Sequence, residues 1–71
     1  MMLTVKKEAL AKRRIEENLS QYMLSILSGL SPNAIYRMES EKHKVNSLRA
    51  QRVARVLECE ITDFFTNEEI L

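Results

Sequence analysis

The chain has 71 residues and a formal net charge of +1, and 45% of its residues are hydrophobic, which predicts one small domain with a modest core. Its single cysteine, Cys59, excludes an intrachain disulfide and a cysteine-based metal cluster. The N-terminal segment is too charged for a signal peptide, and no apolar run approaches the ~18 residues of a membrane span, so we expect a soluble, cytoplasmic protein without metal or cofactor.

Helix-forming residues dominate the chain, and no β-branched or aromatic run alternates with period two. We therefore predict an all-α fold of four to five helices. The domain is expected to span residues 1–66, with a C-terminal tail over residues 67–71. The predicted helices run from Val5 to Glu17, from Gln21 to Ser28, from Pro32 to Ser40, from Ser47 to Leu57 and from Glu60 to Phe65.

Start and stop residues separate these helices. Thr4 is a candidate cap for the first helix, and Asn18 is a residue that can close it in the left-handed conformation. Ser20 and Asn46 can cap the second and fourth helices, because their side-chain oxygens accept hydrogen bonds from the free N–H groups of a first turn. The boundaries of the helices thus follow from local chemistry.

The only glycine and the only proline lie three positions apart, in the stretch GLSPNAIYRME of residues 29–39. Gly29 can end a helix in the left-handed conformation without strain from a Cβ atom. Ser31 can then cap the next helix, and Pro32 can occupy its first position, where a missing N–H costs nothing. On their own, these residues favour an ordinary corner between two helices.

The residues around this corner narrow the interpretation. Leu24 is apolar and Ser25 is small, as a close crossing of two helices requires. The side chains that would hold the second helix of the pair against the core are Leu30, Ile35 and Met38. Those left pointing outward are Pro32, Asn33, Tyr36 and Arg37. This is the pattern of a helix-turn-helix, in which the second helix is presented to the major groove of DNA.

The stretch RRIEENLSQYMLSILSGLSPNAIYRMESEK, residues 13–42, resembles the Cro/phage-repressor (XRE-type) family of bacterial and phage DNA-binding domains. It matches that family's Arg, tight turn, Leu-Ser-Gln and glycine turn, and the Ile and Glu of its recognition helix. The stretch RAQRVARVLECEITDFF, residues 49–65, resembles the closing helices of the family. The resemblance runs without gaps from Leu10 to Phe65 and implies a lambda-repressor-like DNA-binding fold.

The resemblance also implies roles for individual residues. Residues that would meet base edges are Asn33, Arg37 and Pro32, the last by apolar contact alone because its ring has no donor. Residues that would face phosphates are Gln21, Tyr36, Ser40, Lys42, His43 and Lys44. Arg14 and Glu39 match a pair that forms a salt bridge between the first helix and the recognition helix, and Gln21 would also brace the recognition helix.

Two of these roles have simpler alternatives. Arg37 could pair with Glu41 four residues further on rather than with guanine. Arg14 and Glu39 could form an exposed pair that contributes little.

Three arginines of the fourth helix, Arg49, Arg52 and Arg55, are most simply a solvated face. The family often has glycine where this chain has Asn18, Glu41 and Glu58, and a left-handed Glu costs roughly 1 kcal/mol, so two loops are expected to be reshaped.

The charge is unevenly distributed. Residues 1–57 hold all 11 Lys and Arg residues against five Glu, whereas residues 58–71 hold five acidic residues and no basic one. A basic body fits a polyanionic partner, but solvated helices carry such charge as well, so charge alone leaves both interpretations open.

Taken together, these residues predict a small sequence-specific transcription regulator, a repressor rather than an activator, with double-stranded DNA as its partner. One such domain reads few base pairs, so we expect a homodimer on a pseudo-palindromic operator. The expected dimer contacts are Phe64, Phe65, Ile70 and Leu71. The alternative is a protein-interaction module, such as an antitoxin, that uses the acidic C-terminal segment. The sequence contains no catalytic constellation and no evident small-molecule site, so an enzyme is not expected.

Overall fold

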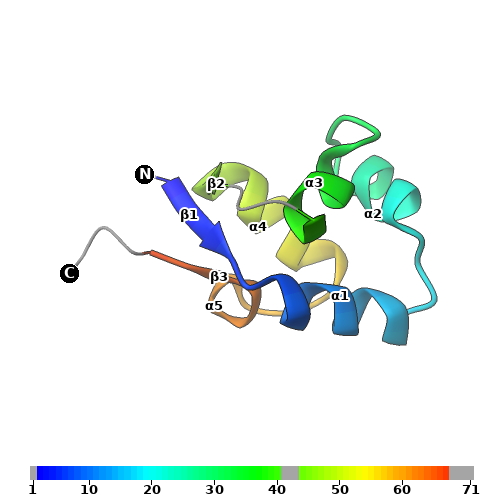
Figure 1. Ribbon diagram of the computed structural model, residues 1–71, viewed down its shortest axis with the longest axis horizontal. Helices are drawn as coiled ribbons and strands as arrows, with labels where there is room; N and C mark the ends of the chain where they lie inside the picture. Colours follow the sequence, from blue (N-terminus) through cyan, green and yellow to red (C-terminus); the bar gives the residue numbers. More distant parts are fainter. Residues whose placement is uncertain (1, 41–43, 68–71) are drawn as a thin grey trace.

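A computed structural model of the chain describes residues 2–40 and 44–67. Within these residues, helices and short strands follow one another along the chain (Figure 1). The elements are β1 (Met2–Val5), α1 (Lys7–Glu16), α2 (Gln21–Leu27), α3 (Ala34–Ser40), β2 (Lys44–Asn46), α4 (Ser47–Val56), α5 (Ile61–Phe64) and β3 (Phe65–Thr66). The fold is mainly helical, with the strands gathered beside α4 and α5 in Figure 1.

The prediction of an all-α fold is wrong in part, because the described residues also form a three-stranded sheet in the order β2-β1-β3. The central strand pairs antiparallel with both neighbours, through Leu3↔Val45 on one side and Val5↔Phe65 on the other. All four side chains are 7% exposed or less, so this face of the sheet completes the core. Strands of two to four residues are too short to show a period-two pattern, and their pairing joins segments that are distant in the sequence.

The sheet also shortens the first and fifth predicted helices. Val5 belongs to β1, so α1 begins at Lys7, and Thr4 pairs within the sheet instead of capping the helix. The backbone N–H of Lys6 donates to the carbonyl of Phe64 at 2.6 Å, which ties the start of α1 to α5. At the other end of the chain, Phe65 is extended and belongs to β3 rather than to the fifth helix.

The local start and stop predictions are confirmed elsewhere. The hydroxyl of Ser20 accepts from the N–H of Met23 at 3.0 Å, and Oδ1 of Asn46 accepts from the N–H of Arg49 at 2.8 Å. Asn18, Gly29 and Glu58 all have positive φ angles, of 59°, 71° and 56°. The turns after α1 and α2 therefore use the left-handed residues that the sequence predicted. The turn after α4 was expected to be reshaped because glutamate disfavours this conformation, but Glu58 adopts it.

The core lies where α1, α2, α3 and α4 meet. Its fully buried side chains include Leu10, Leu24, Ile35, Ala50 and Val53, each 0% exposed. Ile15, near the end of α1, is 62% exposed and does not belong to this core. Among the described residues, no helix is both long and apolar enough to cross a bilayer.

Candidate nucleic-acid interface

The corner between α2 and α3 follows from the conformation of Gly29. With φ at +71°, its N–H donates to the carbonyl of Ile26, and the next N–H, of Leu30, donates to the carbonyl of Ser25. These bonds close the end of α2 and reverse the chain within a few residues. The corner is therefore a tight helix-turn-helix connection.

The third helix begins later than predicted. It starts at Ala34, and Pro32 and Asn33 lie in the turn before it. The carbonyl of Ser31 accepts from the N–H of Ala34, and the carbonyl of Asn33 accepts from the N–H of Arg37, both at 3.0 Å. Because proline fixes φ but cannot donate, it fits this turn as well as it would fit the first helical position. Pro32 and Asn33 therefore stand at the leading end of α3.

One face of α3 is exposed along its whole length. The exposed residues from the turn to the end of the helix are Pro32, Asn33, Tyr36, Arg37 and Ser40. Their spacing of one and four residues places them on one side of a helix with 3.6 residues per turn. The opposite side carries Ile35 and Met38, which are 0% and 2% exposed. The predicted base-reading residues thus share one solvent-facing surface, which we call the α3 face.

Ser25 joins the two helices of the motif by hydrogen bonds. It is 0% exposed, and its hydroxyl donates to the carbonyl of Gln21 at 2.8 Å and accepts from the N–H of Ile35 at 3.0 Å. The second bond supplies a partner for an N–H in the first turn of α3, where the helix itself offers none. The sequence predicted only that this residue is small, whereas the structure shows that its hydroxyl orients α3.

The predicted salt bridge between α1 and α3 is present and largely buried. Nε and Nη2 of Arg14 donate to the two carboxylate oxygens of Glu39 at 2.7 and 3.0 Å, and the two side chains are only 13% and 8% exposed. Nη1 of Arg14 donates to the carbonyl of Leu19 at 2.7 Å. Nε2 of Gln21 donates to the same carboxylate at 2.9 Å, so the predicted brace from α2 is also present. Two helices, α1 and α2, therefore hold the end of α3 through one carboxylate.

The predicted phosphate contacts are only partly described by the structure. Lys44 is exposed at the start of β2, while Lys42 and His43 lie outside the described residues. Glu41, the alternative partner of Arg37, also lies outside them. Ser40 donates its hydroxyl proton to the carbonyl of Tyr36, so it would have to rotate in order to donate to a phosphate.

Two of the four predicted dimer contacts are contradicted. Phe64 and Phe65 are 3% and 2% exposed, and their rings pack edge to face with centroids 6.4 Å apart. Their side chains belong to the core of their own chain and are not available to a partner. Ile70 and Leu71 lie outside the described residues.

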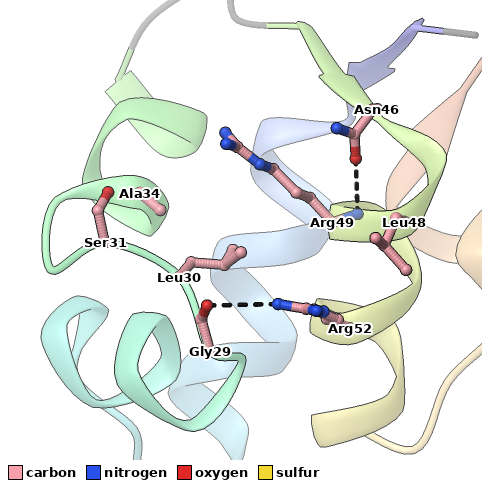
Figure 2. A pocket seen from close by; sticks show the side chains of 8 residues that line it. All are labelled: Gly29, Leu30, Ser31, Ala34, Asn46, Leu48, Arg49 and Arg52. Atoms are coloured by element: carbon pink, nitrogen blue, oxygen red, sulfur yellow. Dashed lines mark hydrogen bonds between the residues drawn. The ribbon is translucent and has the colours of Figure 1, made fainter.

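Residues of α4 that the sequence assigned to a solvated face lie beside the leading end of α3. A hollow of about 350 Å³ separates the two helices, and Figure 2 shows the side chain of Arg49 extending from α4 towards α3. Nη1 of Arg52 donates to the carbonyl of Gly29 at 3.5 Å across the floor of this hollow. The only signal in the sequence was the three-residue spacing of the arginines, which does not reveal what they face.

The electrostatics of this surface are those of unpaired cations. Within residues 2–40 and 44–67, the ion pairs involve Arg13 and Arg14 only, so Arg37 and Arg49 have no carboxylate partner there. In the same part of the chain, no group of three His, Cys, Asp or Glu residues could hold a metal ion. The chemistry that this surface offers is hydrogen bonding and positive charge, displayed from a rigid helix.

Comparisons with known proteins agree with this geometry. The helix-turn-helix family model matches residues 10–64. The fold is similar to the crystal structure of the restriction-modification controller protein C.AhdI from Aeromonas hydrophila, with a TM-score of 0.74 and 26% sequence identity over 80% of this chain and 86% of that one. A search of curated proteins finds no match. The matched residues include the corner at Gly29, the α3 face and the Arg14–Glu39 bridge, and the chain belongs to the XRE-type helix-turn-helix family of DNA-binding transcription regulators.

Proposed function

We propose that this chain is a transcription repressor that binds a specific double-stranded DNA sequence by placing α3 in the major groove. The observation that carries the proposal is the α3 face, in which Asn33, just before α3, and Arg37, within it, are exposed while three part-buried or buried contacts hold the helix in place. A rigid reader loses little conformational entropy on binding, which favours direct recognition of base edges.

The residues of the α3 face divide by chemistry. The amide of Asn33 can accept from N6 and donate to N7 of one adenine, and the guanidinium of Arg37 can donate to N7 and O6 of one guanine. Pro32 can offer only an apolar contact to a thymine methyl group. Tyr36 has a phenol group and is 55% exposed, which suits a phosphate or sugar contact beside the bases.

Phosphate contacts would then set affinity and its dependence on salt. The proposed contacts are Gln21, Ser40, Lys42, His43 and Lys44, and we add Arg49, which extends towards α3 from α4. The amide of Gln21 donates to Glu39, so its remaining donor is the one available to a phosphate. Replacing one phosphate-binding lysine or arginine by alanine should lower the slope of log K against log salt by about 1.

A homodimer on a pseudo-palindromic operator is part of this proposal, because one α3 face covers only a few base pairs. The two half-sites would lie about 10 base pairs apart, centre to centre. The proposal also takes the protein to be a non-enzymatic, cytoplasmic regulator. C.AhdI, the similar structure, is described as a controller protein, which fits a regulatory role.

The test starts with the selection of bound duplexes from a random DNA pool, which yields the operator and the spacing of its half-sites. Arg37→Ala should then cost ~1–3 kcal/mol on that operator and relax the preference at one base position. Lys12→Ala removes the same charge from an exposed residue of α1, which belongs to neither the α3 face nor the proposed phosphate contacts, and serves as the matched control. If Arg37→Ala weakens every duplex equally, as a phosphate contact would, the base-reading role of Arg37 is wrong.

A protein-interaction module remains the competing function, and salt distinguishes the two. A DNA reader should bind random duplex DNA weakly at ~50 mM salt and lose affinity steeply as salt rises. Absence of any binding at that salt concentration would contradict the proposal, because phosphate contacts are strongest there.

A further inference from the structure

A second hollow lies between the C-terminal end of α2 and α4, at the α2–α3 corner. It measures about 320 Å³ and is lined by Leu27, Ser28, Gly29, Arg52, Arg55 and Val56. None of these residues belongs to α3, but Gly29 and Arg52 also line the hollow beside the leading end of α3, so the two hollows adjoin each other. We call the second one the α2–α4 hollow.

Its lining combines apolar surface with unpaired positive charge. Leu27 is 53% exposed and Val56 is half-buried, which gives the hollow apolar walls. Arg52 and Arg55 are exposed, and within the described part of the chain neither has a carboxylate within ion-pair distance. An apolar side chain as exposed as Leu27, flanked by two guanidinium groups that have no carboxylate partner among the described residues, fits a ligand that is both apolar and acidic.

Ser28 adds an independent observation. The residue is only 4% exposed, yet its hydroxyl has no hydrogen-bond partner among the described residues. Buried hydroxyl groups in folded proteins are nearly always hydrogen-bonded, to protein or to water, so the Ser28 hydroxyl in the wall of the hollow is available to a water molecule or to a bound segment. The hollow therefore offers a hydroxyl group beside its apolar walls and its two arginines.

We propose that the α2–α4 hollow binds residues 68–71 of a second copy of this chain. That segment reads Glu-Glu-Ile-Leu and ends a stretch, residues 58–71, that holds five acidic residues and no basic one. Glu68 and Glu69 match the two arginines in charge, while Ile70 and Leu71 match the apolar walls. The exchange is reciprocal, each copy filling the hollow of the other, and produces a dimer with two-fold symmetry.

The geometry favours the segment of a second copy over the chain's own segment. In Figure 1, β3 lies towards one end of the long axis and runs away from α2, which lies towards the other end. The burial of Phe64 and Phe65 also removes the other apolar residues that were expected to form a dimer contact.

Charge reversal tests the proposal without DNA, so that its failure leaves the proposed DNA reading intact. One variant of the full chain carries Arg52→Glu and Arg55→Glu, and another carries Glu68→Lys and Glu69→Lys. Sedimentation in ~150 mM salt should show a wild-type dimer, and each variant should raise its dissociation constant about tenfold or more. Circular dichroism checks that each variant is folded.

Mixing the two variants in equal amounts provides the decisive measurement. Each hollow then meets a segment of opposite charge only on the other variant, so the mixture should form heterodimers at concentrations at which neither variant alone forms a homodimer. The matched control carries Lys7→Glu and Lys12→Glu, the same charge change on two exposed lysines of α1. It leaves the hollow and the acidic segment unchanged, so it should dimerise by itself as the wild type does.

Three results would overturn the proposal. The first is a wild-type chain that stays monomeric, and the second is a pair of variants that dimerise as well as wild type. The third is a mixture that stays monomeric, which would indicate that the segment docks within its own chain or does not dock. If the Arg52→Glu and Arg55→Glu variant dimerises as well as wild type, its binding to DNA shows what the two arginines do; loss of DNA binding is the informative result. In that case the two arginines contact phosphates, and the hollow is not a docking site.

Discussion

Replacing Ser25 by alanine tests how the helix-turn-helix is held together. The change removes one hydroxyl from a residue that is 0% exposed and adds no bulk. The carbonyl of Gln21 stays within the hydrogen-bond ladder of α2, but the N–H of Ile35 loses its acceptor at 3.0 Å in a fully buried position. An unsatisfied buried donor costs about 1–3 kcal/mol, so Ser25→Ala should lower the free energy of unfolding by that amount.

Ser28 provides a matched control within the same segment. It is also buried, at 4% exposed, but its hydroxyl has no partner among the described residues. Ser28→Ala removes an unsatisfied polar group rather than a bonded one, so the free energy of unfolding should change by less than about 0.5 kcal/mol or rise slightly.

Urea unfolding followed by far-ultraviolet circular dichroism suits the measurement, because the chain is mainly helical and contains no tryptophan. A decrease of about 1–3 kcal/mol is a large share of the total for a domain of this size, and it should lower Tm by roughly 5–20 °C. Equal effects of Ser25→Ala and Ser28→Ala would refute the reasoning, since the two serines differ in hydrogen bonding and not in burial.

Two further predictions use the same unfolding assay. Glu39→Ala should destabilise the fold by about 3 kcal/mol, because it leaves the guanidinium of Arg14, whose side chain is only 13% exposed, without a carboxylate partner. Glu16→Ala should cost under about 0.5 kcal/mol, because its 3.7 Å pair with Arg13 is exposed. Similar decreases in the two variants would contradict the assignment of Glu39 as the anchor of α3. Glu58→Gly should stabilise the fold by about 1 kcal/mol, because φ is 56° there and glycine adopts that conformation without strain. Glu17→Gly should destabilise the fold, because φ is −89° at Glu17 and glycine gains nothing there. Lower stability in both variants would show that Glu58 makes a contact that outweighs its backbone strain.

The local parts of the fold could be predicted from the sequence because they depend on neighbouring residues. Ser20 and Asn46 cap helices through bonds to N–H groups three positions away. Gly29 adopts a left-handed conformation because it has no Cβ atom, and asparagine tolerates the same conformation at position 18. The exposed α3 face follows from the spacing of Ile35 and Met38 on the opposite side of the helix. The Arg14–Glu39 bridge was predicted from the family resemblance rather than from any local pattern.

The tertiary structure alone decided the features that join distant segments. Thr4 and Val5 became strand residues, and Phe65 became buried, because β1 pairs with β2 and β3. The strands that pair with β1 come from segments far along the chain, so the residues near Thr4 and Val5 do not predict this pairing. In the same way, nothing near Ser25 in the sequence shows that its hydroxyl bonds to Ile35, and nothing near Ser28 shows that its hydroxyl has no partner among the described residues. The sequence by itself determined the starts of α2 and α4, the turns at Asn18 and Gly29, and which side of α3 is exposed, since capping and helical periodicity act within a few residues. Contacts between segments far apart in the chain leave no such periodic pattern, so the sheet, the buried hydrogen bonds of α3 and the α2–α4 hollow became visible only in the folded molecule.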